Sequence, residues 1–160
     1  MFIDQFSCQR GTELSINADQ ASEFAKTVSN DFNPIHDPGN RRFCVPGDLL
    51  FALAVERYGL AQSMEFHFTG LVSADTALIF PFDQCNMFEI LDSRGKEYLR
   101  VSLDGERLVA NDGVEALVRA YVRFSGQNFP HILVPLMTEQ NVMINAQRPL
   151  IIYQLSLIHI

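Results

Sequence analysis

The feature that most constrains the fold is a nearly continuous apolar run that follows Gly47. After Asp48, only Glu56 and Arg57 bring charge into this run. A helix that is apolar on nearly every side is stable only when the rest of the protein covers it. We therefore predict a buried helix over residues 47–62, around which the remainder of the chain has to fold.

Beyond this run the sequence takes on the pattern of β-strands separated by tight turns. Turn-forming residues recur at positions 92–95, 104–105 and 111–113, with short apolar segments between them. Apolar residues then occupy every second position from Val114 to Phe124, which is the period of a strand with one buried face. The sequence thus predicts an α+β fold in which an antiparallel sheet wraps around one long buried helix.

A second helix is predicted before the apolar run. Asn17 and Gln20 have the spacing of a capping box, and apolar residues on one helical face follow them, which predicts a helix over residues 18–29. The next segment, residues 30–46, contains three prolines and is expected to be irregular.

The character of the chain changes once more near its C-terminal end. We predict one domain over residues 1–125 and a C-terminal extension over residues 126–160. The extension ends in an apolar run at 150–160, which would be prone to aggregation if it were unpaired. It therefore adds a strand to the sheet or to a partner, or it is the start of a truncated segment.

Composition excludes several classes of protein. Of the 160 residues, 48% are hydrophobic and 19% are charged, which is unlike a disordered chain. A net charge of −7 has the wrong sign for a non-specific nucleic-acid binder, so no nucleic-acid partner is expected. With no signal-peptide pattern and no apolar stretch that could span a membrane, we expect a cytoplasmic protein with no membrane partner. The three cysteines are odd in number and lack a Cys-x-x-Cys motif, so we predict buried thiols without disulfides and no metal site.

Asp31 and His36 have a spacing that points to acid–base chemistry. They flank Asn33 and Pro34, where the proline keeps the preceding residue out of the helical region and the asparagine can bond to nearby backbone. A rigid turn of this kind can bring a carboxylate and an imidazole to one point, where they can hold a water molecule and move its protons. The alternative is that Asp31 caps local backbone and His36 is a polar loop residue.

The same segment carries a resemblance to a known family. Ser29, Asp31, Asn33, Pro34 and His36 fit the pattern Ser-x-Asp-x-Asn-Pro-x-His in register. In this the chain resembles the MaoC-like, (R)-specific enoyl-CoA hydratases of the hotdog superfamily. Weaker matches follow in the family's order at residues 45–50, 66–76 and 115–124.

The resemblance implies a hotdog fold for the predicted domain and a homodimer. It also implies a hydratase or dehydratase that adds water to a trans-2-enoyl thioester of CoA or of an acyl-carrier protein, without a cofactor of its own. Asp31 and His36 would be the catalytic pair, supported by Asn33 and Pro34. The backbone N–H of Gly47 would bind the thioester oxygen at the start of the buried helix.

Two positions depart from the family pattern. Pro46 stands where the family usually has His or Gln, and Asp48 stands where it usually has Met. The Asp48 carboxylate would lie near the developing enolate charge and oppose catalysis. Two alternatives stay open: a non-catalytic acyl-thioester-binding protein, and a hotdog thioesterase that uses Asp48 or Glu56.

Arg41 and Arg42 follow the motif closely. Arginine binds phosphate with two parallel hydrogen bonds, so this pair is a candidate for contacts with the phosphates of CoA. The alternative is a pair of solvated loop residues.

Overall fold

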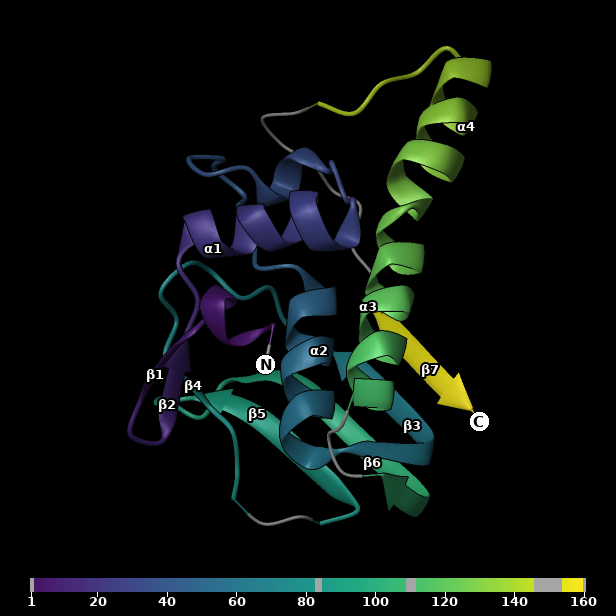
Figure 1. Ribbon diagram of the computed structural model, residues 1–160. Coiled ribbons are helices and arrows are strands. Elements are labelled where there is room, and N and C mark those ends of the chain that lie inside the picture. Colours follow the sequence, from purple (N-terminus) through teal and green to yellow (C-terminus); the bar gives the residue numbers. More distant parts are fainter. Residues whose placement is uncertain (1, 83–84, 109–111, 146–153, 160) are drawn as a thin grey trace.

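The computed structural model describes residues 2–82, 85–108, 112–145 and 154–159 (Figure 1). The strands are β1 (Cys8–Arg10), β2 (Glu13–Ser15), β3 (Leu60–Phe68), β4 (Leu78–Ile79), β5 (Met87–Asp92), β6 (Glu97–Leu108) and β7 (Leu155–His159). The α-helices are α1 (Ala18–Glu23), α2 (Gly47–Tyr58), α3 (Asp112–Gly126) and α4 (Val134–Glu139). Shorter 3-10 or π-helical segments are η1 (Asp4–Phe6), η2 (Phe24–Ser29), η3 (Pro34–His36) and η4 (Phe129–Leu133). The predicted α+β class is confirmed.

The strands in the described ranges form one seven-stranded sheet in the order β1-β2-β4-β5-β6-β3-β7, and each neighbouring pair is antiparallel. The predicted turn at residues 104–105 is wrong, because both residues lie within β6. There the register with β3 shifts between Ala61 and Ser63, and Gly105 has a φ of 83°. An Asp-Gly pair suits such a bulge as well as it suits a hairpin turn.

Helix α2 is the predicted buried helix. It lies against one face of the sheet, and the ring of Phe51 packs edge-on against that of Phe66 on β3, with 4.8 Å between their centroids. The helix ends at Tyr58 rather than at residue 62, because Gly59 has a φ of 83° and the chain then enters β3. Several of its side chains are fully shielded from solvent: Leu49, Phe51, Ala54 and Val55.

The segment with alternating apolar residues is helix α3, so the prediction of a strand over 114–124 is wrong. Its buried valines, Val114, Val118 and Val122, are four residues apart. That interval fits one face of a helix as well as one face of a strand. An ion pair between Glu115 and Arg119, with 3.0 Å between nitrogen and oxygen, adds the local support that a helix surface allows.

Position 111 of the predicted turn at 111–113 lies outside the described residues, and the other two positions belong to the first turn of α3.

Helix α3 packs on α2 and reaches the end of η2. The ring of Tyr121 lies against that of Phe51, with 4.4 Å between the centroids. At the last residue of α3, a Cβ atom on Gly126 would overlap the backbone of Ser29, so only glycine permits this approach. Beyond it, η4 and α4 continue the helical path and project away from the sheet (Figure 1).

The N-terminal helix begins as predicted. The side chain of Asn17 accepts the N–H of Gln20 at 2.8 Å, and the side chain of Gln20 accepts the N–H of Asn17 at 3.1 Å. The helical path runs through α1 and the π-helical η2 to Ser29, and it ends where Asn30 adopts a left-handed φ of 58°.

Part of the C-terminal extension joins the sheet. β7 pairs with β3 and lies at the outer edge of the sheet, opposite the edge formed by β1. The division into a domain over 1–125 and an extension stays a prediction. None of the described helices combines the length and the apolar character that crossing a membrane requires.

Candidate functional site

The loop that follows η2 is shaped by short-range hydrogen bonds. Asp31 Oδ1 accepts the N–H of Asn33 at 2.9 Å, and Asn33 Oδ1 accepts the N–H of Ile35 at 3.2 Å. Pro34 starts the 3-10 turn η3, which ends at His36. The turn therefore folds the chain back on itself and brings the imidazole of His36 to the carboxylate of Asp31.

Asp31 and His36 form a buried pair. The distance between His36 Nε2 and Asp31 Oδ2 is 3.4 Å, and His36 Nδ1 lies 2.8 Å from the carbonyl oxygen of Cys44. The two residues are 5% and 6% exposed. Each nitrogen of the imidazole ring therefore has a partner, which fixes the orientation of the ring.

The surroundings hold His36 in its charged form. Burial lowers the pKa of the imidazole, but the Asp31 carboxylate and the Cys44 side chain outweigh this and raise it to about 10. At neutral pH both ring nitrogens then carry a proton. In this state His36 is an acid, and Asp31 is the group of the pair that can accept a proton.

The cavity beside the pair has a volume of about 220 Å³. Both Asp31 and His36 line it, together with the first turn of α2 and the segment that follows β3. A hydrogen bond of 2.8 Å from the N–H of Val45, two residues before α2, to the carbonyl of Val72 ties the start of this helix to the segment after β3.

Gly47 opens helix α2 at this cavity. The carbonyl of Pro46 accepts the N–H groups of Leu49 and Leu50, whereas the first N–H groups of a helix have no partner within it. A Cβ atom at Gly47 would lie 3.2 Å from the ring of Phe68, so any larger residue here would require that ring to shift. The positive end of the helix thus faces the cavity.

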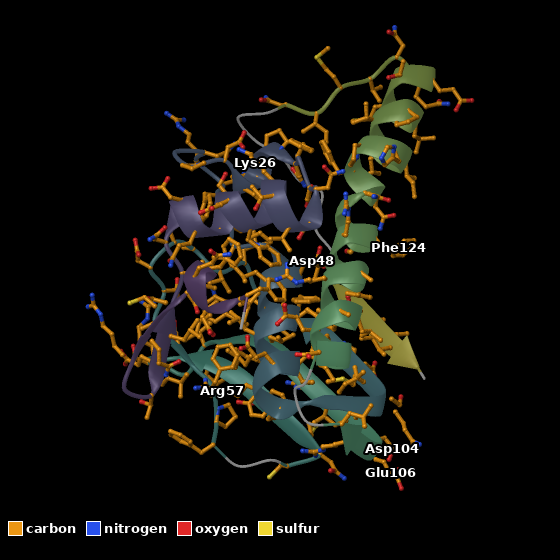
Figure 2. The ribbon with its side chains drawn as sticks, viewed as in Figure 1. Lys26, Asp48, Arg57, Asp104, Glu106 and Phe124 are labelled. Carbon is orange, nitrogen blue, oxygen red and sulfur yellow. The ribbon has the colours of Figure 1, made fainter. Side chains whose placement is uncertain are left out.

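Asp48 lies in the same cavity, at the N-terminal end of α2 and next to α3 (Figure 2). It is partly exposed. Burial raises the pKa of its carboxyl to about 7; a hydrogen bond with the Ser125 side chain lowers it and the charge of Asp31 raises it. Near neutral pH this carboxyl is therefore protonated in a large share of the molecules.

Three predicted residues lie away from this cavity. Arg41 is exposed and Arg42 is partly exposed, and neither lines it. Glu56 and its neighbour Arg57 line a second cavity, of about 500 Å³. Burial and the neighbouring Asp4 raise the pKa of Glu56 to about 7.

The sequence did not indicate the residues that α3 and β7 bring to the cavity. Ser125 comes from α3, Ser156 comes from β7, and Gln154 directly precedes β7. The Tyr121 hydroxyl on α3 donates to Ser156 Oγ at 2.8 Å and links the two elements. No local motif marks these residues, because their meeting depends on how two distant elements pack.

Metal ligands are not gathered at this site or elsewhere in the part of the chain that the structure describes. No group of three or more His, Cys, Asp or Glu side chains there is placed to hold a metal ion. The prediction that the thiols are buried is right for Cys44 and wrong for Cys8 and Cys85, which are exposed.

Comparisons with known proteins place the chain in a family. No curated protein and no solved structure matches it. A family model described as "Protein of unknown function (DUF3581)" matches residues 1–160. The chain therefore belongs to the DUF3581 family.

Proposed function

We propose that this protein is a hotdog-fold hydratase or dehydratase that adds water to a trans-2-enoyl thioester, or removes it in reverse. The observation that carries the proposal is the buried pair of Asp31 and His36, which faces a cavity at the N-terminal end of α2. An antiparallel sheet packed on the buried α2 supports the hotdog assignment.

The chemistry follows from the charge state of the pair. Asp31, as carboxylate, takes a proton from a bound water molecule, and the resulting hydroxide oxygen forms a bond to the β carbon. The electron pair of the double bond moves to the thioester oxygen as an enolate. The imidazolium of His36 then gives its proton to the α carbon. Proton transfer from Asp31 to His36, across the 3.4 Å between them, restores the starting state.

The enolate oxygen needs a donor that is already oriented. The N–H of Gly47 fills this role, because Gly47 is the first residue of α2 and the positive end of that helix lies at the cavity. Asp48 opposes an enolate only when it is ionised. A pKa of about 7 keeps much of its population neutral and reduces that opposition.

Hydration of crotonyl-CoA is the direct test. Loss of absorbance of the conjugated thioester is expected with the wild-type protein, and a crotonyl-carrier-protein thioester tests the other carrier. Absence of turnover on both carriers, for crotonyl and for hydroxylated 2-enoyl groups alike, would refute the hydratase. Saturation binding of the same thioesters without turnover would instead favour the non-catalytic binding protein.

A thioesterase is the second candidate, and the place of Asp48 in the cavity favours it. Its carboxylate would activate water for attack on the thioester carbonyl, with the N–H of Gly47 binding the oxyanion. Glu56 no longer fits this role, because it lines a different cavity. Release of free thiol from saturated acyl-CoA distinguishes a thioesterase from a hydratase.

We also propose a cytoplasmic homodimer that uses Arg41 and Arg42 for the CoA phosphates. Both side chains reach solvent, as contacts with a ligand that extends out of the cavity require. Reversing their charge is expected to raise KM for crotonyl-CoA but not for crotonyl-pantetheine, which lacks the nucleotide phosphates.

A further inference from the structure

One wall of the catalytic cavity is polar. Asp48, Ser125 and Ser156 line it, from α2, α3 and β7 in turn. The rest of the lining includes the apolar side chains of Leu50 and Phe68 as well as the polar motif residues Asp31, Asn33 and His36. An acyl chain that enters this cavity therefore meets hydroxyl and carboxyl groups as well as hydrocarbon.

The side chains of this polar wall have donor and acceptor positions beyond those used in their bonds to one another. Ser156 Oγ accepts the hydroxyl of Tyr121 at 2.8 Å, and the hydrogen of the Ser156 hydroxyl is not used in that bond. Asp48 and Ser125 bond to each other, yet a carboxyl group has more acceptor positions than one serine occupies.

The backbone fixes where these groups lie. Ser156 pairs in register with Phe66 in the centre of β3, whereas its neighbours Leu155 and Leu157 are exposed on the other face of β7. Ser125 is held by the close approach of the adjoining Gly126 to η2. The polar wall is thus built on regular elements rather than on a mobile loop.

An alkyl chain against such a wall would remove water from these groups and leave them without partners, which is costly. The hydroxyl group of a hydroxylated acyl chain would instead replace the hydrogen bonds that the displaced water had made. Sites built around such hydrogen bonds reject the analogue that lacks the polar group far more strongly than apolar pockets reject a substrate of the wrong length.

We propose, on the basis of the function proposed above, that the substrate is a 2-enoyl thioester with a hydroxyl group on its acyl chain beyond the double bond. Asp48, Ser125 and Ser156 recognise that hydroxyl group. They determine specificity, while Asp31 and His36 carry out the proton transfers.

Matched pairs of thioesters test the proposal on the full chain. trans-4-Hydroxy-2-butenoyl-CoA is compared with crotonyl-CoA, and trans-5-hydroxy-2-pentenoyl-CoA with trans-2-pentenoyl-CoA. The hydroxylated member of at least one pair is expected to have a kcat/KM about tenfold higher or more. Ser156→Ala is expected to reduce this preference about tenfold. Ser63→Ala, on β3 and outside the cavity, should keep the preference of the wild type.

A binding measurement separates this proposal from the proposed function. The Asp31→Asn variant should bind the hydroxylated thioesters more tightly than the alkyl thioesters in calorimetry. If this preference is present but wild-type protein turns over none of them, the polar wall is supported and the hydratase is refuted. If both members of each pair are bound or turned over equally, the proposed recognition of a hydroxyl group is wrong, whereas hydratase activity on crotonyl-CoA would still stand.

Discussion

Gly126 at the end of α3 packs directly on the backbone of Ser29, two residues before Asp31. This contact joins the helix that carries Ser125 to the segment that leads into the motif loop. The cavity is therefore assembled by a contact between two backbones, which no side chain could replace.

Gly126→Ala is expected to destabilise the protein by about 1–3 kcal/mol, because the added methyl group overlaps the Ser29 carbonyl and forces α3 to move. Urea denaturation measures the change in the free energy of unfolding. Gly113→Ala is the matched control, since this exposed glycine lies in the first turn of the same helix. Equal stability of the two variants would show that the contact at Gly126 is not tight in solution.

Asp31→Asn is expected to lower the kcat for crotonyl-CoA by about 10²–10⁴, the usual contribution of a positioned acid or base. Folding should persist, because an amide oxygen can still accept the N–H of Asn33. Asp37→Asn serves as the control. Asp37 forms an exposed ion pair with Lys26 at 2.6 Å, and such pairs contribute little. A comparable loss in both variants would argue for general damage to the loop.

Asp48→Asn distinguishes the two candidate activities. In a hydratase, this change removes a negative charge from beside the enolate, so crotonyl-CoA hydration is expected to persist or rise. In a thioesterase, it removes the group that activates water, so thiol release from butyryl-CoA should fall about 10²–10⁴-fold. Parallel assays on both substrates decide between them, and loss of hydration alone would contradict the hydratase mechanism given above.

The elevated pKa of Asp48 also predicts how stability depends on pH. As the pH rises from about 4 to about 7, the unfolded chain loses this proton while the folded protein retains it. The folded state then binds more protons, so the free energy of unfolding falls with rising pH, by up to roughly 4 kcal/mol. Asp48→Asn should remove this loss. The free energy of unfolding of the variant, relative to that of wild type, should therefore be higher at pH 8 than at pH 4. Glu56 titrates in the same range, so the difference between variant and wild type is the quantity to measure.

Leu157→Lys tests the proposed homodimer. β7 is an edge strand with Leu155 and Leu157 exposed, and Leu157 lies opposite Glu65 of β3. A lysine there can pair with Glu65, while charge on an edge strand opposes edge-to-edge association. We expect a dimer for wild type and a monomer for the variant in analytical ultracentrifugation. A wild-type monomer at high concentration would refute the dimer.

Local signals in the sequence were sufficient for several elements. Asn17 and Gln20 cap the first helix as predicted, and the apolar run after Gly47 is the buried α2. The motif from Asp31 to His36 could be predicted as one turn, because proline restricts the residue before it and asparagine bonds to backbone only a few residues away.

Other features depend on packing that no short segment reveals. Val114, Val118 and Val122 fit both a strand and a helix, and the contact of α3 with α2 favours the helix. Ser125 and Ser156 become site residues only because α3 and β7 reach the cavity from distant parts of the chain. The motif loop was therefore predictable, while the residues that α3 and β7 bring to the cavity were not.

β3 pairs with β7, a strand that is synthesised much later, and this order affects folding during translation. β3 leaves the ribosome long before Ser156 does, so its outer edge lacks that strand while the middle of the chain is still being made. An edge that waits in this way can recruit strands from other nascent chains. β7 emerges after β3, covers this edge and brings Ser156 to the cavity, so the same pairing both protects β3 from other chains and completes the cavity lining.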